Sequence, residues 1–226
     1  MLALLYDVHG NLPALDAVLA DAEAAGAERF VLGGDYALFG GWPEETLARL
    51  RELDADWIRG NCDRWTADPA SVPDVPEVRA AVERCREMLD AADASTLGAL
   101  PAELVLGGVR YCHASPVSDM RSFLPEPADD EPELLRGVGE RRLVFGHTHL
   151  QFTRRAGDIE LVNPGSVGMP TDGDHRAAYA LVADDGSLEL RRAAYDHQAS
   201  ADAVRRRLGP AGETAARRIE AARFEV

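Results

Sequence analysis

The stretch LALLYDVHGN at residues 2–11 decides the fold class. Its apolar run from Leu2 to Tyr6 predicts a buried strand, and two polar side chains, Asp7 and His9, follow that strand at once. Asn11 is placed to cap a helix, since apolar residues recur with helical spacing over residues 12–19. A buried strand that leads directly into a helix predicts the first unit of a parallel α/β sheet.

The same pattern recurs downstream. Phe30–Leu32 predicts a second strand, Pro43–Leu53 a second helix with leucines on one face, and Trp57-Ile58 a third strand that ends at Gly60. Strand, helix, strand, helix and strand within the first 60 residues indicate a parallel sheet covered by helices. In such sheets chemistry is expected just beyond the carboxyl ends of the strands.

The rest of the chain carries further helices and closely spaced strands. Residues 75–100 are expected to be helical, residues 126–133 to form an acidic loop that leads into a helix, and residues 199–224 to be helical again. Glycine-containing turns at 107–108 and 184–186 predict hairpins. The expected strands after residue 100 are 103–106, 109–112, 143–145, 151–154, 159–162, 178–183 and 188–192.

No repeat or linker divides the chain. We therefore expect a single domain over residues 1–226, with the C-terminal helices at about 199–224 packed on it. The apolar runs are far shorter than the roughly 18 residues that span a bilayer, and the N-terminal residues lack the basic start of a signal peptide. We expect a cytoplasmic protein with no membrane partner. The sequence is compatible with a monomer or with a homo-oligomer.

Charge and cysteine content exclude several classes of protein. The 226-residue chain has 24 basic residues, all of them arginine, against 39 acidic ones, for a formal charge of −15. Such a chain disfavours nucleic acid, which binds basic surfaces, but allows a small phosphorylated substrate if the site itself is positive. The three cysteines include no C-x-x-C pair, which argues against a disulfide framework and against a zinc–thiolate site.

Strong metal ligands gather at the predicted strand ends. In a D-x-H or H-x-H pair on an extended backbone, both side chains point the same way and can reach one site. Imidazole, carboxylate and amide groups without thiolates suit borderline transition metals. Seven ligands exceed what one ion needs, and two ions that share a carboxylate account for the set. These residues are Asp7, His9, Asp35, Asn61, His113, His147 and His149.

Six motifs in this order resemble the calcineurin-like metallophosphoesterases, most closely their small bacterial and archaeal phosphodiesterase branch. The motifs are D-x-H-G-N (7–11), G-G-D (33–35), G-N-C-D (60–63), H-A-S-P (113–116), G-H-T-H (146–149) and N-P-G-S-V-G (163–168). The resemblance implies a four-layer α/β/β/α sandwich with a dinuclear metal centre at one edge.

The resemblance also implies a role for each ligand. The ions would be divalent transition metals, manganese first, with iron, nickel, cobalt or zinc as alternatives. A hydroxide that bridges them would attack phosphorus in line. Asp7, His9 and His149 would hold the first metal, Asn61, His113 and His147 the second, and Asp35 would bridge both; Asp35, Asn61 and His113 form the expected catalytic set.

One departure from the family pattern bears on the substrate. Phosphomonoesterases of this family usually show G-N-H, whose His protonates the leaving group, together with an Asp and an Arg in G-D-x-x-D-R. Here Cys62, Leu38 and Phe39 occupy those positions. Without that acid, phosphodiesters with good leaving groups are favoured. A phosphatase or a dinucleoside polyphosphate hydrolase is the alternative, and a non-catalytic metal-binding scaffold is a further one.

Side chains beside the motifs are candidates for contacting the substrate, which we expect to be a small phosphorylated molecule such as a nucleotide. Aromatic rings can stack on a base, and arginines can pair with a second phosphate. The candidates are Asn11, Tyr36, Cys62, Asp63, Arg64, Trp65 and Arg121. The turn at 163–166 is expected to shape the floor of the site.

Overall fold

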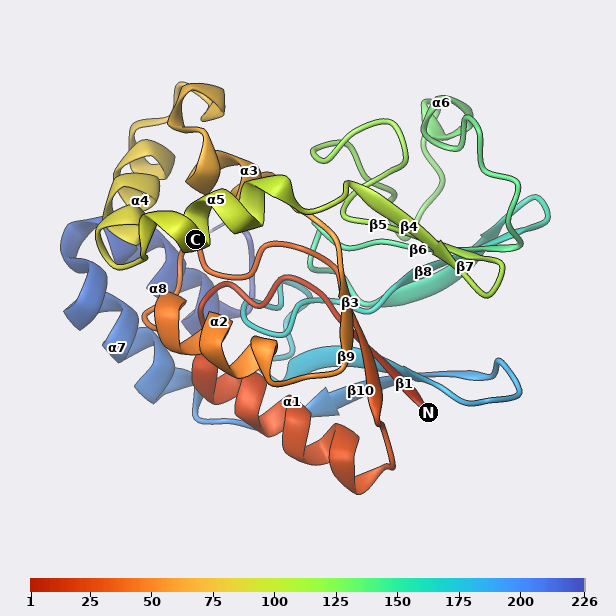
Figure 1. Ribbon diagram of the computed structural model, residues 1–226, viewed down its shortest axis with the longest axis horizontal. Helices are drawn as coiled ribbons and strands as arrows, with labels where there is room; N and C mark the ends of the chain where they lie inside the picture. The colour runs from red at the N-terminus through yellow and green to blue at the C-terminus, as the bar shows by residue number, and fades with distance from the viewer. Residues whose placement is uncertain (226) are drawn as a thin grey trace.

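Strand β1 (Leu2–Leu5) lies at the centre of a five-stranded sheet in the computed structural model, which describes residues 1–225 (Figure 1). It pairs in parallel with β2 (Arg29–Leu32), which pairs in parallel with β3 (Ala55–Trp57). On its other side, β1 pairs antiparallel with β9 (Ala177–Val182), which forms a hairpin with β10 (Leu188–Ala193). The order of this first sheet is β10–β9–β1–β2–β3.

The second sheet also has five strands, in the order β4–β5–β6–β8–β7. A hairpin of β4 (Glu103–Leu106) and β5 (Val109–Cys112) forms one edge. Strand β5 then pairs in parallel with β6 (Arg142–Val144), and β6 in parallel with β8 (Ile159–Asn163). Strand β7 (Phe152–Ala156) closes the other edge antiparallel to β8.

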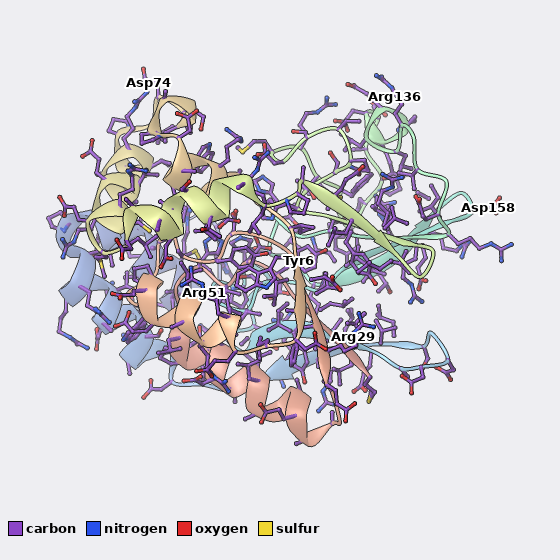
Figure 2. The ribbon with its side chains drawn as sticks, in the orientation of Figure 1. Tyr6, Arg29, Arg51, Asp74, Arg136 and Asp158 are labelled. Atoms are coloured by element: carbon purple, nitrogen blue, oxygen red, sulfur yellow. The ribbon has the colours of Figure 1, made fainter. Side chains whose placement is uncertain are left out.

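The alternation of side chains along β1 explains how the two sheets are layered. Leu4 and Tyr6 belong to an apolar core that they share with side chains of the second sheet, and Figure 2 shows Tyr6 in the middle of the molecule. Ala3 and Leu5 belong to a different core, which lies between the first sheet and its helices. Because successive residues of a strand face opposite sides, β1 is buried on both faces.

Helices and a helix-containing loop cover the outer faces, which completes the four-layer α/β/β/α sandwich (Figure 1). Phe123 and Leu134 pack on the outer face of the second sheet. The helices are α1 (Leu12–Ala24), α2 (Pro43–Arg51), α3 (Asn61–Ala67), α4 (Pro76–Glu87), α5 (Ala91–Ala99), α6 (Glu131–Leu134), α7 (His197–Leu208) and α8 (Glu213–Ala221), with 3-10 turns at Pro69–Ser71 and Gly209–Gly212.

The C-terminal helices contact the start of the chain. Helices α7 and α8 pack together and share a small apolar cluster with Met169. The Ser200 hydroxyl in α7 donates a hydrogen bond to the Asn11 side-chain oxygen at 2.6 Å. Asn11 is the N-cap residue of α1 as expected, but its side chain makes no capping hydrogen bond, because its amide group also donates to the Gly168 carbonyl, at 2.7 Å.

The sequence predicts most strands to within two residues of their observed bounds. Both predicted hairpins are confirmed, with β4–β5 and β9–β10 antiparallel, and the acidic stretch leads into a helix as expected, although α6 already begins at Glu131, inside the range predicted as loop. Helix α3 was not predicted, since its seven residues are too few to show helical periodicity and carry the polar G-N-C-D motif. None of the helices within residues 1–225 combines the length and apolarity needed to cross a bilayer.

We expect Leu4→Ala to lower the free energy of unfolding by about 2–5 kcal/mol, because Leu4 is fully buried between the sheets and its loss leaves a cavity. Val105→Ala is the matched control, since Val105 is 49% exposed on an edge strand; its effect should stay within about 0.5 kcal/mol. Urea-induced unfolding measures both, and equal losses would contradict the assignment of the core between the sheets.

Candidate metal centre

Seven polar residues from loops of both sheets converge at one edge of the molecule. The loops follow β1, β2 and β3 of the first sheet and β5 and β6 of the second, and the carboxyl ends of these strands meet there. Every residue that the sequence nominated as a metal ligand lies in this cluster. These residues are Asp7, His9, Asp35, Asn61, His113, His147 and His149.

Asp7, His9 and His149 form one group of ligands. The imidazoles of His9 and His149 face each other with their Nε2 atoms 3.0 Å apart. The Asp7 Oδ1 atom lies 4.0 Å from His9 Nε2 and 3.5 Å from His149 Nε2. All three side chains are buried. One ion placed among these three atoms would be in reach of each of them.

Asn61, His113 and His147 form the second group. The end of the Asn61 amide lies 3.0 Å from His113 Nε2 and 2.9 Å from His147 Nδ1. The amide oxygen faces both ring nitrogens, and a flip of the amide would instead let its NH₂ donate to both of them. A cation there would therefore meet two imidazole nitrogens and one amide oxygen.

Asp35 lies between the two groups. Its Oδ2 atom is 3.4 Å from His113 Nε2 and 4.0 Å from His9 Nε2. Its Oδ1 atom accepts a hydrogen bond of 2.8 Å from the Cys62 backbone N–H. Asp7 is held in the same manner, since its Oδ2 accepts from the His147 backbone N–H at 3.0 Å. Each carboxylate thus has one oxygen fixed by backbone and the other directed into the cluster.

The donor set fits a cation. The Nδ1 atoms of His9 and His149 donate to the carbonyls of Leu38 and Met169, at 3.0 and 2.7 Å, so in the neutral rings the two facing Nε2 atoms both carry lone pairs. Asp7 Oδ1 is buried and accepts no hydrogen bond from the described residues. Buried acceptors this close repel one another unless positive charge lies between them.

Burial and mutual contact set the protonation of the imidazoles. Burial, helped by His149, lowers the pKa of His9 to about 4, and burial, helped by His113, lowers the pKa of His147 to about 4. Burial also works against a charged His113, but the Asp35 carboxylate outweighs it and raises the pKa of His113 to about 10. At neutral pH, His9 and His147 are therefore neutral, as a metal ligand must be.

The loops hold five of the seven residues in left-handed backbone conformations. Residues other than glycine seldom adopt this region, and each costs about 1–3 kcal/mol. Among the described residues, only Phe39 and Ala222 are further non-glycine examples. The five φ angles are 55° at Asp7, 50° at His9, 59° at Asp35, 70° at His147 and 60° at His149. Strain concentrated in this way is typical of a functional site.

Two glycines give the carboxylates room. A Cβ atom on Gly60 would lie 2.1 Å from Asp35 Oδ1, and one on Gly146 would lie 2.5 Å from Asp7 Oδ2. Both contacts are too short for any real Cβ atom. The glycines that precede Asn61 and His147 in the motifs therefore allow the backbone to pass close to Asp35 and Asp7.

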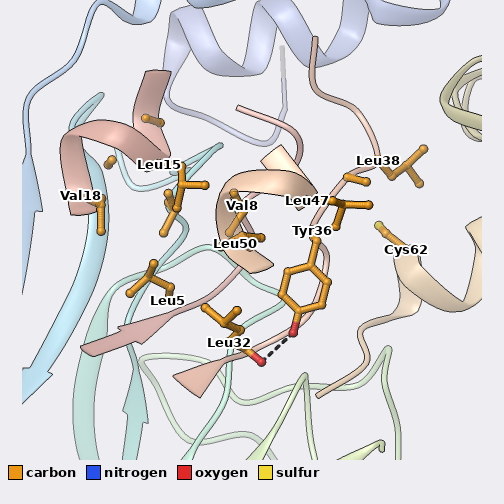
Figure 3. Close-up of a cluster of buried hydrophobic side chains, with 14 of the residues drawn as sticks. Leu5, Val8, Leu15, Val18, Leu32, Tyr36, Leu38, Leu47, Leu50 and Cys62 are labelled. Atoms are coloured by element: carbon orange, nitrogen blue, oxygen red, sulfur yellow. Dashed lines mark hydrogen bonds between the residues drawn. The ribbon is translucent and has the colours of Figure 1, made fainter. Parts of the chain in front are cut away.

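Three of the expected substrate contacts are part of the scaffold instead. The Tyr36 hydroxyl lies 2.7 and 2.6 Å from the carbonyl oxygens of Leu32 and Ile58, deep in the core; Figure 3 shows the first of these contacts. Trp65 packs in the core of the first sheet, and Asn11 bonds to Gly168 and α7. These side chains are engaged within the protein and are not presented to a substrate.

Asp63 is also engaged, and it holds the loop that carries Asp35. Its carboxylate accepts hydrogen bonds from the backbone N–H groups of Asp35 at 2.8 Å, Tyr36 at 3.1 Å and Gly60 at 2.8 Å. Burial and the nearby Asp35 charge raise the pKa of Asp63 to about 7. Asp63 therefore positions Asp35, although the sequence suggested only a contact with substrate.

The two arginines expected to bind phosphate are already paired. Arg64 donates two hydrogen bonds to the Asp119 carboxylate, at 2.7 and 2.9 Å. Arg121 is exposed and donates to Asp130 and Glu133 in the acidic loop. Neither side chain has a free charge to offer without losing its present partner.

Cys62 lies beside the candidate metal ligands. Its Sγ atom falls within 4.8 Å of ligand atoms of His9 and Asp35. Burial and the Asp35 charge raise the pKa of its thiol well above the ordinary value, so the thiol is neutral. Leu38 belongs to the same buried apolar cluster, as Figure 3 shows, and the Phe39 ring lies 5.8 Å from the His9 ring.

Sequence reasoning missed the carbonyl groups that orient the imidazoles, because a backbone acceptor leaves no signal in the residue type. Leu38, Met169 and Gly33 supply these acceptors, the last one to His113 Nδ1 at 2.8 Å. The turn at 163–168 does have a sequence motif, and its Ser166 hydroxyl donates to the Asp7 carbonyl at 2.7 Å.

Comparison with protein families agrees with this geometry. The model of the calcineurin-like phosphoesterase superfamily domain matches residues 1–186. An uncharacterized protein, MJ0912, of Methanocaldococcus jannaschii is 30% identical over 220 residues, which cover 87% of this chain and 88% of that protein. The phosphodiesterase YfcE of Escherichia coli K12 is 29% identical over 198 residues, which cover 82% of this chain and 89% of YfcE.

Comparison with solved structures gives the same fold. A metallophosphoesterase from Sphaerobacter thermophilus superposes with a TM-score of 0.84 at 26% sequence identity, and the match covers 98% of both chains. The match therefore includes the C-terminal helices α7 and α8, which lie beyond the region that the family model covers.

We expect Asp63→Asn to weaken metal binding by about 10- to 100-fold while every candidate ligand stays in place. The amide would put a donor against backbone N–H groups that now donate to a carboxylate, and the loop carrying Asp35 would shift. Calorimetric titration of the metal-free protein with manganese measures the affinity. Asp68→Asn, in an exposed turn, is the control and should bind as wild type; an unchanged affinity in Asp63→Asn would contradict the positioning role.

Proposed function

Because the chain belongs to the calcineurin-like phosphoesterase superfamily, we propose that it is a phosphodiesterase that works with two divalent metal ions. Family membership makes it a metal-dependent phosphoesterase. The proposal adds two points to family membership: that the centre holds two ions, and that the enzyme prefers diesters. The observation that carries the proposal is the position of Asp35, with one carboxylate oxygen facing His9 on one side and His113 on the other.

In this proposal each group of three residues holds one ion and Asp35 contacts both. The first group is Asp7, His9 and His149, and the second is Asn61, His113 and His147. When bound, two divalent ions supply positive charge for the phosphoryl oxygens and lower the pKa of water so that it can attack phosphorus. The nitrogen and oxygen donors suit manganese first, with iron, cobalt, nickel or zinc as competitors.

The chain's own contribution is orientation and charge. Backbone carbonyls accept from the Nδ1 atoms of His9, His113 and His149, so their Nε2 atoms face the centre and, in the neutral rings that bind metal, would offer a lone pair. Two divalent ions less the carboxylates of Asp7 and Asp35 leave the centre at about +2, although the whole chain carries −15. A small anionic substrate is therefore attracted to this edge of the molecule and repelled elsewhere.

The preference for diesters is supported by what lies beside the centre. Burial raises the pKa of the Cys62 thiol well above its ordinary value, which makes it a weak acid, and Leu38 has no proton to donate to a leaving alkoxide. A diester carries a single charge and does not require the phosphate-binding arginine that Phe39 replaces. The similarity to YfcE, named a phosphodiesterase, points to the same reaction.

We expect Asp35→Asn to bind fewer than two ions per chain and to lose more than about 100-fold in kcat with a bis-aryl phosphate diester. The amide removes the shared negative charge, so the repulsion between two ions is no longer offset. Metal analysis and steady-state kinetics with manganese measure both effects. Asp16→Asn, at an exposed site on α1, is the control; full metal content and near-wild-type turnover in Asp35→Asn would rule out the dinuclear assignment.

We expect the rate to depend steeply on the pKa of the leaving group, since general acid catalysis worth about 100- to 10,000-fold is missing. The wild type should hydrolyse aryl diesters well and alkyl monoesters hardly at all. Cys62→His alone should change little, because Leu38 cannot orient the imidazole. The double variant Cys62→His with Leu38→Asp should flatten the dependence and raise monoesterase activity.

A panel of aryl and alkyl monoesters and diesters, with diadenosine polyphosphate added, measures this preference. If the wild type cleaves alkyl monoesters at least as fast as diesters, the enzyme is a phosphatase and another group supplies the proton. If it turns over none of these with any candidate metal, the proposed phosphodiesterase activity is wrong.

A further inference from the structure

A cavity of about 380 Å³ opens beside the second group of ligands. His113 forms part of its wall, so the cavity adjoins the proposed metal centre. The lining also includes Arg59, which lies between β3 and α3, and the remainder comes largely from the loop that follows β5. Its volume falls within the range of about 300–1,000 Å³ that is typical of small-molecule sites.

Arg59 is the free positive charge of this cavity. The two carboxylates that line it are engaged by other arginines, since Asp119 pairs with Arg64 at 2.7 Å, and Glu103 pairs at 2.7 Å with Arg110, which also pairs with Glu140. Within residues 1–225, no carboxylate lies within 4.0 Å of the Arg59 guanidinium. Arg59 is therefore the arginine of this cavity whose charge no carboxylate of the described residues pairs, in a strongly acidic protein.

The Arg59 side chain is held in place by one hydrogen bond, and its other donors remain free of partners among the described residues. Its Nη1 atom donates to the Gly98 carbonyl at 2.9 Å, near the C-terminal end of α5, and its backbone N–H donates to the Pro101 carbonyl at 2.8 Å. Its other guanidinium N–H groups donate to no acceptor in the part of the chain that the structure describes. A half-buried, oriented guanidinium with free donors is suited to a planar or tetrahedral oxyanion.

Other residues of the cavity suit the rest of a phosphorylated ligand. The Ser118 oxygen accepts hydrogen bonds from the N–H groups of Met120 and Arg121, both at 3.1 Å, so its hydroxyl hydrogen is available to donate to a ligand. Pro116 and Val117 add apolar wall, against which an organic group can pack. The cavity thus combines one cation, one hydroxyl donor and apolar surface.

We propose that Arg59 is a specificity-determining residue that binds a second phosphate, carried on one ester arm of the diester substrate. This inference rests on the proposed phosphodiesterase function and narrows its substrate class to diesters with an additional phosphate group. In this arrangement the reacting phosphorus lies at the metal centre. One ester arm of the substrate extends past His113 into the cavity, where the Arg59 guanidinium binds the additional phosphate. The arginines expected from the sequence, Arg64 and Arg121, are excluded because each is already paired.

The test compares matched substrates. Adenylyl-(3′→5′)-adenosine is one, and the others are the same dinucleotide with a 5′-terminal or a 3′-terminal phosphate. Wild type should prefer at least one phosphorylated form in kcat/KM by about 10-fold or more, the scale of a charge-assisted hydrogen bond. Arg59→Gln should bring the ratio close to 1, and Arg59→Lys, which keeps the charge without the fork, should give an intermediate ratio.

Arg206→Gln is the control, because it removes the same charge from an exposed position on α7 and should keep the wild-type ratio. Calorimetry with adenosine 3′,5′-bisphosphate and adenosine 5′-monophosphate gives a readout independent of turnover. The bisphosphate should bind the manganese-loaded wild type about 10-fold more tightly or better, and Arg59→Gln should lose that advantage.

A wild type that cleaves the dinucleotide without any preference for the phosphorylated forms overturns the role of Arg59 and leaves the phosphodiesterase function standing. Equal preference in wild type and a folded Arg59→Gln does the same. Failure to cleave any diester overturns the proposed function, and the calorimetric comparison then decides separately whether Arg59 binds a phosphate.

Discussion

The structure depends on the buried acceptors of Asp7, His9 and His149, which face one another with no donor between them. The His9 and His149 nitrogens are 3.0 Å apart, and Asp7 Oδ1 accepts no hydrogen bond from the described residues. Burial of such groups is costly unless a cation is present. Five left-handed backbones in the same loops add on the order of 5–15 kcal/mol, about the net stability of a typical domain. Metal binding and folding are therefore expected to be coupled.

The two-sheet architecture explains how the chain sustains this arrangement. Leu4 and Tyr6 lock the first sheet against the second, so loops after β1 and β6 meet at a fixed distance although their residues are about 140 positions apart. Gly60 and Gly146 let backbone approach the carboxylates, and Asp63 ties together the loops that carry Asp35 and Asn61. The arginines around the centre differ in their ion pairs. Arg64 and Arg121 are paired with carboxylates, whereas Arg59 has no carboxylate partner among the described residues.

The sequence predicts features that depend on single residue types, but not those that depend on which side chains pair in three dimensions. The strands and the seven clustered residues were accessible, because burial patterns and ligand types are written in single residues such as Asp7 and His113. The substrate contacts were not, because the choice among Tyr36, Arg64 and Arg59 depends on which side chains find partners in three dimensions. The Tyr36 hydroxyl bonds to a carbonyl in the core, and Arg64 pairs with Asp119. Arg59, which no motif includes, lines the cavity and has no carboxylate partner among the described residues. Helix α3 and the left-handed backbones likewise have no signature in a short polar motif.

We infer that the acceptors at this edge form a site for two cations that share Asp35. Anomalous diffraction from crystals of the protein grown with manganese tests it most directly. We predict two manganese peaks per chain, one against Asp7, His9 and His149, the other against Asn61, His113 and His147, with Asp35 touching both. A single peak, or peaks elsewhere while these seven side chains keep their present positions, would contradict the claim.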